Sequence, residues 1–222
     1  MQRRVGTVLA SGTLAAGLVV SAQVLAGGST DRLAPTAASA AAEAPGDDVA
    51  AATLRLPDGT ALGEVRMVAN GGNTRVTLTA GAPAGLRASG GSFHGFHVHA
   101  NDDPANGSGC LADPAAPSST WFTAVDGHYA APGAVHGDHL GDLPTVYLQQ
   151  DGQARSTFVT DRFTPADVVG RAVIVHLDPD NHANVPTGDA PTEYTPNSPA
   201  ATSLTDRTGN AGDRAACGVL SR

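Results

Sequence analysis

The sequence contains no lysine, so all 13 of its basic side chains are arginines, and these are scattered rather than clustered. Together with 21 acidic residues they give a formal charge of −8 at pH 7. A protein that binds nucleic acid needs a clustered basic surface to neutralise phosphates. The composition therefore argues against nucleic acid as a partner.

Cysteine is also scarce, with only Cys110 and Cys217 in 222 residues. No cysteine stands directly after the apolar N-terminal segment, so a bacterial lipoprotein anchor is not expected. In an exported chain a lone pair of cysteines indicates one disulfide, and the alternative is two buried thiols. Closing a loop of this length would stabilise the fold by about 4–5 kcal/mol in the chain-entropy model.

The first 26 residues have the layout of a secretory signal peptide. Arg3 and Arg4 precede an uncharged, largely apolar stretch that ends in Val24-Leu25-Ala26. We therefore expect cleavage, no stable membrane span afterwards, and an extracellular or cell-envelope location. The alternative is an N-terminal membrane anchor, for which the length barely suffices.

Residues 27–48 are rich in Ala, Pro, Ser and Thr and contain almost no large apolar side chains. Such a segment buries too little surface to offset the entropy of ordering, so we predict a flexible linker. The remaining stretch, 49–222, is long enough for one domain with its own core.

This domain shows an all-β pattern of short Val-, Leu- and Thr-rich segments separated by turn residues. Asn70-Gly71-Gly72-Asn73 and Asp151-Gly152 indicate hairpins, and only 164–169, with Thr164 as N-cap, is typical of a helix. The pattern predicts an antiparallel sandwich or flattened barrel. Its expected strands are 52–56, 62–69, 74–79, 93–100, 145–150, 154–160, 172–177 and 216–220.

Two connections, 101–144 and 178–213, are too long for plain hairpins, and long loops in compact domains are usually functional. Histidines gather in these loops or on the strands that enter them. On the expected strand at 93–100, His97 and His99 share one face while Phe96 and Val98 face the core. Two imidazoles on one rigid strand form half of a transition-metal site, although a His-x-His pair taken alone favours two surface histidines over metal ligands.

A second cluster lies in the first long connection, where His128, His136, His139 and Asp142 fall within fifteen residues. Three imidazoles and one carboxylate match the ligand set of a tetrahedral zinc site. The alternative is a polar loop with unrelated histidines. His176 ends the apolar run at 172–176, and Asp178 and Asp180 follow it as carboxylates that support metal ligands do.

The motifs together resemble the copper–zinc superoxide dismutases, in particular their bacterial exported branch, over about 52–220. The resemblance rests on four motifs that occur in family order, and the cysteine pair joins them. They are Gly95-Phe96-His97-Val98-His99, His139-Leu140-Gly141-Asp142-Leu143-Pro144, Val175-His176 with Asp180-Asn181, and Gly209-Asn210-Ala211-Gly212-Asp213-Arg214-Ala215-Ala216-Cys217-Gly218-Val219.

The resemblance implies an eight-stranded antiparallel Greek-key barrel and an enzyme that converts superoxide to dioxygen and hydrogen peroxide by copper redox cycling. It implies that His97, His99, His128 and His176 hold copper. It implies that His128, His136, His139 and Asp142 hold zinc, with His128 bridging the two metals.

Further roles follow from the same resemblance. Asp180 is expected to link a copper histidine to a zinc histidine, and His94 to hydrogen-bond backbone rather than metal. Arg214 is expected to stand beside the copper, where it and His128 are the catalytic residues. Thr208 is expected to narrow the substrate channel, and Cys110 and Cys217 match the family disulfide. Dimer surfaces differ within the family, so a homodimer is an open option.

The sequence departs from the family at two places. Seventeen residues separate Cys110 from His128, more than is usual there, and only two separate His136 from His139. Both histidines can then reach one ion only if the loop turns sharply. This leaves a copper-only dismutase with a degenerate zinc site as an alternative. Two further hypotheses are a copper-binding domain without catalysis and an immunoglobulin-like domain without metal.

Overall fold

The computed structural model of the protein describes residues 48–81, 91–180 and 199–222. The predicted signal peptide at 1–26 and the predicted linker at 27–48, apart from Asp48, lie outside the described residues, as does 181–198 of the second long connection. In the described parts of the chain, no helix is long and apolar enough to cross a membrane.

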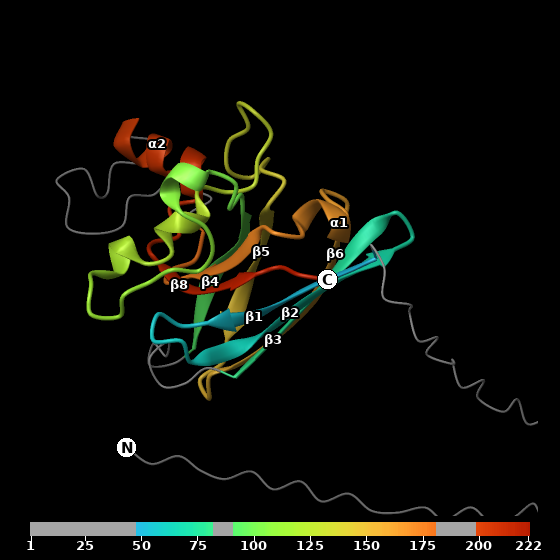
Figure 1. Ribbon diagram of the computed structural model, residues 1–222, viewed down its shortest axis with the longest axis horizontal. Coiled ribbons are helices and arrows are strands. Elements are labelled where there is room, and N and C mark those ends of the chain that lie inside the picture. Colours follow the sequence, from blue (N-terminus) through green and yellow to red (C-terminus); the bar gives the residue numbers. More distant parts are fainter. Residues whose placement is uncertain (1–47, 82–90, 181–198) are drawn as a thin grey trace, which may run out of the picture. The chain divides into compact units, whose positions relative to one another are not determined.

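Eight antiparallel strands form one sheet whose order is β5-β4-β7-β8-β1-β2-β3-β6. The two edge strands, β5 and β6, are joined by the short turn predicted at Asp151-Gly152, so the sheet curls into a nearly closed barrel (Figure 1). This confirms the predicted all-β fold. The strands are β1 (Val49–Arg55), β2 (Ala61–Asn70), β3 (Asn73–Gly81), β4 (Ser92–His99), β5 (Asp142–Leu148), β6 (Gln153–Thr160), β7 (Ala172–His176) and β8 (Arg214–Val219).

The expected strands all exist, and their ends differ by a few residues. Strands β1 and β5 both begin three residues earlier than expected, and the earlier start of β5 at Asp142 brings Pro144 into that strand. Proline lacks the N–H that a central strand donates, but β5 is an edge strand and Pro144 lies at the irregularity in its pairing with β4, where it has no paired residue. The earlier start of β5 places Asp142 on a strand instead of in a loop.

Helix α1 (Pro165–Val168) lies where a helix was predicted, with Asp167 Oδ2 accepting hydrogen bonds from the backbone and hydroxyl of Thr164. Helix α2 (Pro199–Thr208) was missed, because the sequence analysis assigned a helix only to 164–169. Leu204 is the one large apolar residue of α2, so the helix shows no apolar periodicity from which it could be recognised.

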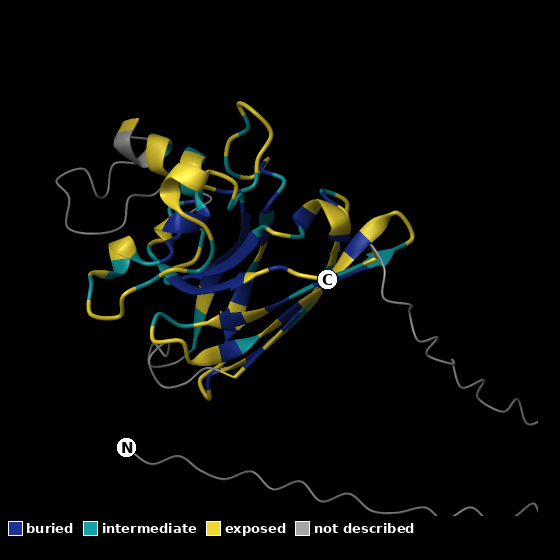
Figure 2. Cartoon of the chain, in the orientation of Figure 1, coloured by how far each residue is buried: buried dark blue, intermediate teal, exposed yellow. Residues whose placement is uncertain are grey.

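Burial differs between the two halves of the barrel. Strands β1, β2 and β3 alternate buried and exposed residues, whereas β7 is buried throughout and β4 is buried from His94 to His99 (Figure 2). A strand that is buried on both faces needs a cover on its outer face. Here the cover includes the connection after β4, which places Phe122 and Val125 against Ile174 and Cys217 in a small second core.

Candidate metal centre

The strand ladders bring together residues that are far apart in the sequence. Backbone pairing places His97 opposite Asp142 between β4 and β5, His99 opposite His128 in an isolated bridge, and His176 opposite Arg214 between β7 and β8. The positions of these side chains are therefore set by backbone hydrogen bonding on rigid strands.

The face of β4 that carries the histidines is opposite to the one that enters the barrel core. Phe96 and Val98 are fully buried inside the barrel, as predicted, and His97 and His99 lie on the other side beneath the covering loops. Both histidines are fully buried as well. A buried imidazole needs partners for its two nitrogens, so these rings indicate a polar site under the loops.

Four buried imidazoles converge at this place. His97, His99, His128 and His176 each offer a nitrogen, and these nitrogens all lie within 4.8 Å of one another. Among the described residues, the buried side-chain nitrogens without a hydrogen-bond partner include one from each ring: His97 Nδ1, His99 Nε2, His128 Nε2 and His176 Nε2. Leaving such a group unpaired costs about 1–3 kcal/mol. Four convergent lone pairs instead fit a transition metal that imidazole binds well.

The second nitrogen of each ring is held, and this fixes which nitrogen is free. His97 Nε2 lies 2.9 Å from Asp180 Oδ1, His99 Nδ1 lies 2.9 Å from the carbonyl of Asp126, and His176 Nδ1 lies 3.1 Å from the carbonyl of Gly212. Because carbonyl and carboxylate oxygens only accept, each held nitrogen carries the proton. The opposite nitrogen then presents its lone pair to the centre of the group.

Burial also keeps His99, His128 and His176 uncharged. It lowers the pKa of His99 and of His176 well below the usual value for histidine, and it lowers the pKa of His128 to about 4. Three of the four rings are thus neutral at pH 7. Neutral imidazole is the form that binds metal, so no proton must first be removed from these three rings.

A second group centres on one carboxylate oxygen. Asp142 Oδ1 lies 2.8 Å from His128 Nδ1, 3.1 Å from His136 Nδ1 and 3.3 Å from His139 Nδ1. In a tetrahedral zinc site with bonds of about 2.0–2.1 Å, neighbouring ligand atoms lie about 3.3 Å apart. The donor set and its spacing therefore fit zinc.

His97 also lies close to this second group. Ligand atoms of His97, His128, His136 and Asp142 fall within 4.8 Å of one another, a set that includes His97 in place of His139. The nitrogen of His97 that has no partner belongs to the four-imidazole group, however, and its Nε2 is held by Asp180. His139 Nδ1 lies 3.1 Å from His128 Nδ1, so His139 is the better fourth donor.

The short loop between His136 and His139 turns sharply, as two bound histidines would require. Gly137 has φ of 101°, a conformation that L side chains rarely adopt. Asp142 Oδ2 accepts hydrogen bonds from the backbone N–H of Gly137 at 2.6 Å and of His139 at 3.1 Å. Asp142 therefore shapes the turn with one oxygen and faces the three imidazoles with the other.

The electrostatics of this group keep Asp142 ionised, whereas they favour the protonated form of His136, which must lose its proton before it can bind a metal. Burial alone would raise the pKa of the Asp142 carboxyl, but hydrogen bonds from His128 and His136 hold it well below its usual value. Burial of His136 acts to lower its pKa, and Asp142 more than offsets this, so the pKa of His136 is raised. Asp142 is thus an anion at neutral pH, as a metal-binding carboxylate must be.

Asp180 connects the two groups. Its Oδ1 lies 2.9 Å from His97 Nε2 and 3.7 Å from His136 Nε2. The backbone of Gly209 passes close to both, because a Cβ atom at this residue would lie 2.7 Å from Asp180 Oδ1 and 2.5 Å from His136 Nε2. The turn after α2 thus covers the carboxylate, and only glycine fits there.

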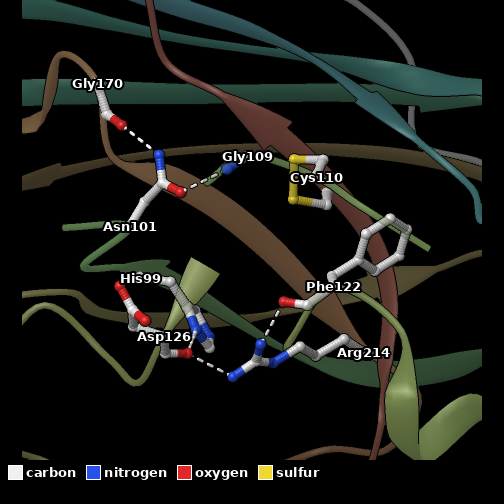
Figure 3. The surroundings of a disulfide bond; sticks show 9 residues. His99, Asn101, Gly109, Cys110, Phe122, Asp126, Gly170 and Arg214 are labelled. Carbon is white, nitrogen blue, oxygen red and sulfur yellow. Dashed lines mark hydrogen bonds between the residues drawn. A yellow bond between two sulfur atoms is a disulfide. The ribbon is translucent and has the colours of Figure 1, made fainter. Parts of the chain in front are cut away.

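Arg214 stands at the start of β8, partly buried beside the four-imidazole group. Its guanidinium donates to the backbone carbonyls of Phe122 and Asp126, and the carbonyl of Asp126 also accepts from His99 (Figure 3). Burial lowers the pKa of Arg214, but an arginine keeps its charge in proteins. The site therefore has a fixed cation next to one of its histidines.

Four other predicted residues have clear positions. His94 Nδ1 lies 2.7 Å from the carbonyl of His176 and its Nε2 lies 2.7 Å from Ser92 Oγ, so both of its nitrogens have partners other than metal. The hydroxyl of Thr208 donates to the carbonyl of Leu204 in its own helix α2. Cys110 and Cys217 form the predicted disulfide, with Cα atoms 5.6 Å apart.

Two residues that contact the site were missed by the sequence analysis. Asp126 places its carbonyl between His99 and Arg214, and Arg162 donates to the carbonyls of Gly137 and His139. Asp126 acts through its own backbone carbonyl, and Arg162 acts on the carbonyls of other residues. The type of the residue that supplies a carbonyl gives no signal of such a contact. The Asp126-Gly127 pair before His128 was the one local sign of an unusual turn.

Comparisons with known proteins agree with this geometry. Residues 61–220 match the family model described as copper/zinc superoxide dismutase. A copper–zinc superoxide dismutase of Mycolicibacterium paratuberculosis is 33% identical over 190 residues, which covers 84% of this chain and 80% of the relative. That of Mycobacterium tuberculosis is 34% identical over 189 residues, covering 80% and 72%.

Among solved structures, the clock protein EA4 superposes with a TM-score of 0.53 at 23% identity, covering 78% of this chain and 94% of that one. At this identity the likeness shows the fold alone. The family match extends over most of the barrel and over every residue of the two donor groups. The chain therefore belongs to the copper/zinc superoxide dismutase family.

Proposed function

We propose that this superoxide dismutase converts superoxide to dioxygen and hydrogen peroxide at copper held by His97, His99, His128 and His176. The observation that carries the proposal is the set of four buried, partnerless nitrogens that point to one place beside a guanidinium. Copper supplies reversible one-electron chemistry there, whereas zinc is redox-inert and organises the site. The protein residues have the remaining tasks.

Arg214 would bind and orient the anion. Its guanidinium is fixed by two backbone carbonyls, so it needs no reorganisation when superoxide arrives, and its charge is permanent. The ladder places it directly opposite His176. An anion held by Arg214 would therefore lie next to the four imidazoles.

His128 would handle the proton. Its Nδ1 lies among the donors of the second group, whereas its Nε2 belongs to the first. In the half-reaction that oxidises superoxide to dioxygen, Nε2 would take up a proton. In the half-reaction that reduces a second superoxide, Nε2 would return that proton, and solvent would supply the other proton of hydrogen peroxide.

Two alternatives from the sequence are less well supported. A copper-only enzyme would not need three imidazole nitrogens within 3.3 Å of one carboxylate oxygen. A copper carrier would not need a fixed guanidinium beside its ligands. Asp142 thus favours a complete zinc site, and Arg214 favours catalysis.

The decisive experiment combines metal analysis of the purified protein with a superoxide-consumption assay on wild type and Arg214→Ala. We expect one copper and one zinc per chain in both proteins, and kcat/KM at least about tenfold lower in the variant, because a fixed transition-state donor is lost. Arg155→Ala, which removes an exposed arginine of β6, is the matched control. Equal activity of Arg214→Ala at equal copper content would overturn the role of Arg214.

We also propose export, from the signal-like segment at 1–26 together with the disulfide, which forms and persists in oxidising compartments. Mass spectrometry of the protein recovered outside the cytoplasm should find an N-terminus near residue 27. An intact Met1 in a cytoplasmic fraction would contradict export.

A further inference from the structure

Asp126 has a backbone conformation that is normally restricted to glycine. Its φ is 63° and its ψ is −158°. Non-glycine residues held in such regions cost about 1–3 kcal/mol, and they persist only where the surrounding structure fixes them. Asp126 ends the short turn at Thr123–Val125, and Phe122, which begins the turn, also has a positive φ of 56°.

The two residues of this turn that have a positive φ, Phe122 and Asp126, are the two that hold Arg214. The guanidinium donates to the carbonyl of Phe122 at one end of the turn and to the carbonyl of Asp126 at the other (Figure 3). The carbonyl of Asp126 also accepts from His99 Nδ1 at 2.9 Å. One carbonyl oxygen thus links a histidine of the copper group to the cation beside it.

The side chain of Asp126 explains how the conformation is kept. Its Oδ2 accepts the backbone N–H groups of Asp102 at 2.8 Å and Asp103 at 2.9 Å, and its Oδ1 accepts from Asn106 Nδ2 at 2.8 Å. All three donors lie in the loop that follows β4. Three hydrogen bonds to an anion are worth more than neutral ones, and together they can offset the backbone strain.

We propose that Asp126 is a positioning residue whose carboxylate, fastened to the 102–106 loop, fixes the carbonyl that sets His99 and Arg214 relative to each other. The inference rests on the proposed role of Arg214 in orienting the anion. It adds a residue whose side chain contacts the 102–106 loop and which acts through its own backbone carbonyl.

A purely electrostatic role for Asp126 predicts the opposite effect. Removing a carboxylate near the guanidinium would strengthen the attraction for an anion. Loss of positioning would instead weaken anion binding, because the guanidinium and the ring of His99 would lose a shared acceptor. The direction of the change therefore separates the two roles.

The test uses the copper- and zinc-loaded full domain and azide as the anion probe, with the azide dissociation constant read from the copper spectrum. Asp126→Ala retains the strain and loses the three hydrogen bonds, so we expect azide affinity and kcat/KM to fall about tenfold, in the range for groups that orient metal ligands. We also expect an altered copper electron paramagnetic resonance spectrum, through His99. Asp126→Gly removes the strain and should lie between Asp126→Ala and wild type.

Asp126→Asn serves as the conservative variant, since asparagine has the shape of aspartate and its amide oxygen can still accept hydrogen bonds from the loop. It should stay within about threefold of wild type, and it keeps the test valid if Asp126→Ala fails to fold. Asp113→Asn is the charge control, because this exposed aspartate of the same connection also accepts a backbone N–H. It should leave azide affinity and the spectrum unchanged.

A double variant separates failure of this inference from failure of the proposed function. If Asp126 acts through Arg214, adding Asp126→Ala to Arg214→Ala should lower azide affinity little further. Unchanged or tighter azide binding in Asp126→Ala, with Arg214→Ala still impaired, would overturn the positioning role alone. Wild-type azide binding in Arg214→Ala would overturn the role of Arg214 on which the inference rests.

Discussion

Asp180 Oδ1 lies 2.9 Å from His97 Nε2, although 83 positions separate the two residues in the chain. The same oxygen lies 3.7 Å from His136 Nε2 in the second donor group. One buried carboxylate therefore orients a ring of each group and fixes the proton of His97 on Nε2, so that its Nδ1 is free to bind. The two donor groups are thus connected through Asp180 as well as through His128, which belongs to both.

Asp180→Asn is expected to weaken both sites together. The amide can still accept one hydrogen bond, but it loses the negative charge that makes the two histidines better donors. We expect copper and zinc affinities each to fall about 10- to 100-fold, measured by competition with chelators of known affinity. Asp138→Asn, which removes one charge from an exposed side chain of the loop between His136 and His139, is the control. Loss of zinc alone, with copper affinity unchanged, would show that Asp180 does not couple the sites.

Arg162 is expected to act on zinc in particular. Its two terminal nitrogens donate to the carbonyls of Gly137 and His139, so the guanidinium closes the short loop that carries His136 and His139. In Arg162→Ala this loop would lose both of these hydrogen bonds, while its hydrogen bonds to Asp142 would remain. We predict that zinc affinity falls about tenfold, as for other groups that orient metal ligands, with copper affinity little changed.

The matched control for Arg162 is Arg155→Ala, an exposed arginine of β6 whose removal changes the charge by the same amount. Arg162→Lys should recover only part of the zinc affinity, because an ammonium group cannot reach both carbonyls in the fork geometry of a guanidinium. Equal loss of zinc in both alanine variants would mean that charge, rather than the two hydrogen bonds, supports the loop.

The start of helix α1 gives a stability prediction with a defined pH dependence. Hydrogen bonds from the hydroxyl and backbone N–H of Thr164 hold the pKa of Asp167 below its usual value of about 3.9. A carboxyl whose pKa is lower in the folded than in the unfolded state stabilises the fold above its usual pKa. This contribution is lost as the pH falls through the lowered value.

Thr164→Ala removes one of these donors and should raise the pKa of Asp167 toward its usual value, which an NMR titration of the Asp167 carboxyl would measure. At pH 7 we expect the variant to lose about 1 kcal/mol in its free energy of unfolding, the typical cost of losing such a cap. The loss should shrink at acidic pH. A loss that stays constant down to about pH 3, below the usual pKa of the carboxyl, would contradict this origin.

The strands were open to prediction from local patterns, whereas the full set of donor histidines followed from the resemblance of four motifs to a known family. Alternating apolar residues and glycine turns gave the strands, and the spacing of His97 and His99 placed two rings on one face. The spacing of His136 and His139 could not show whether both reach one carboxylate. That depends on the positive φ of Gly137 and on the second oxygen of Asp142, which the fold supplies.

Helix α2, Arg162 and Asp126 were not predictable for a different reason. Helix α2 has no apolar stripe, and its contact with the site is made by backbone atoms, since the carbonyl of Asp206 accepts from the N–H of His136 at 2.7 Å. Arg162 and Asp126 likewise act on or through carbonyl groups. Every residue has a carbonyl, so side-chain identity does not reveal which carbonyls are used.

The disulfide is expected to support both stability and catalysis. It ties the connection after β4 to β8, and Phe122, whose carbonyl holds Arg214, packs against the bonded Cys217 and donates its N–H to the carbonyl of Leu111. Replacing Cys110 and Cys217 with alanine releases a loop of 107 residues. We expect the free energy of unfolding, measured in urea, to fall by about 4–5 kcal/mol.

In the same variant the activity should fall by a larger fraction than the amount of bound copper. The support for the guanidinium is weakened, whereas His97, His99, His128 and His176 keep their places in the backbone. Reductant should lower the stability of wild type to that of the double variant and should leave the variant itself unchanged, which provides an internal control. Full activity per bound copper in the variant would mean that the disulfide stabilises the fold but does not position Arg214. The position of Arg214 would then depend on the turn between Phe122 and Asp126 alone.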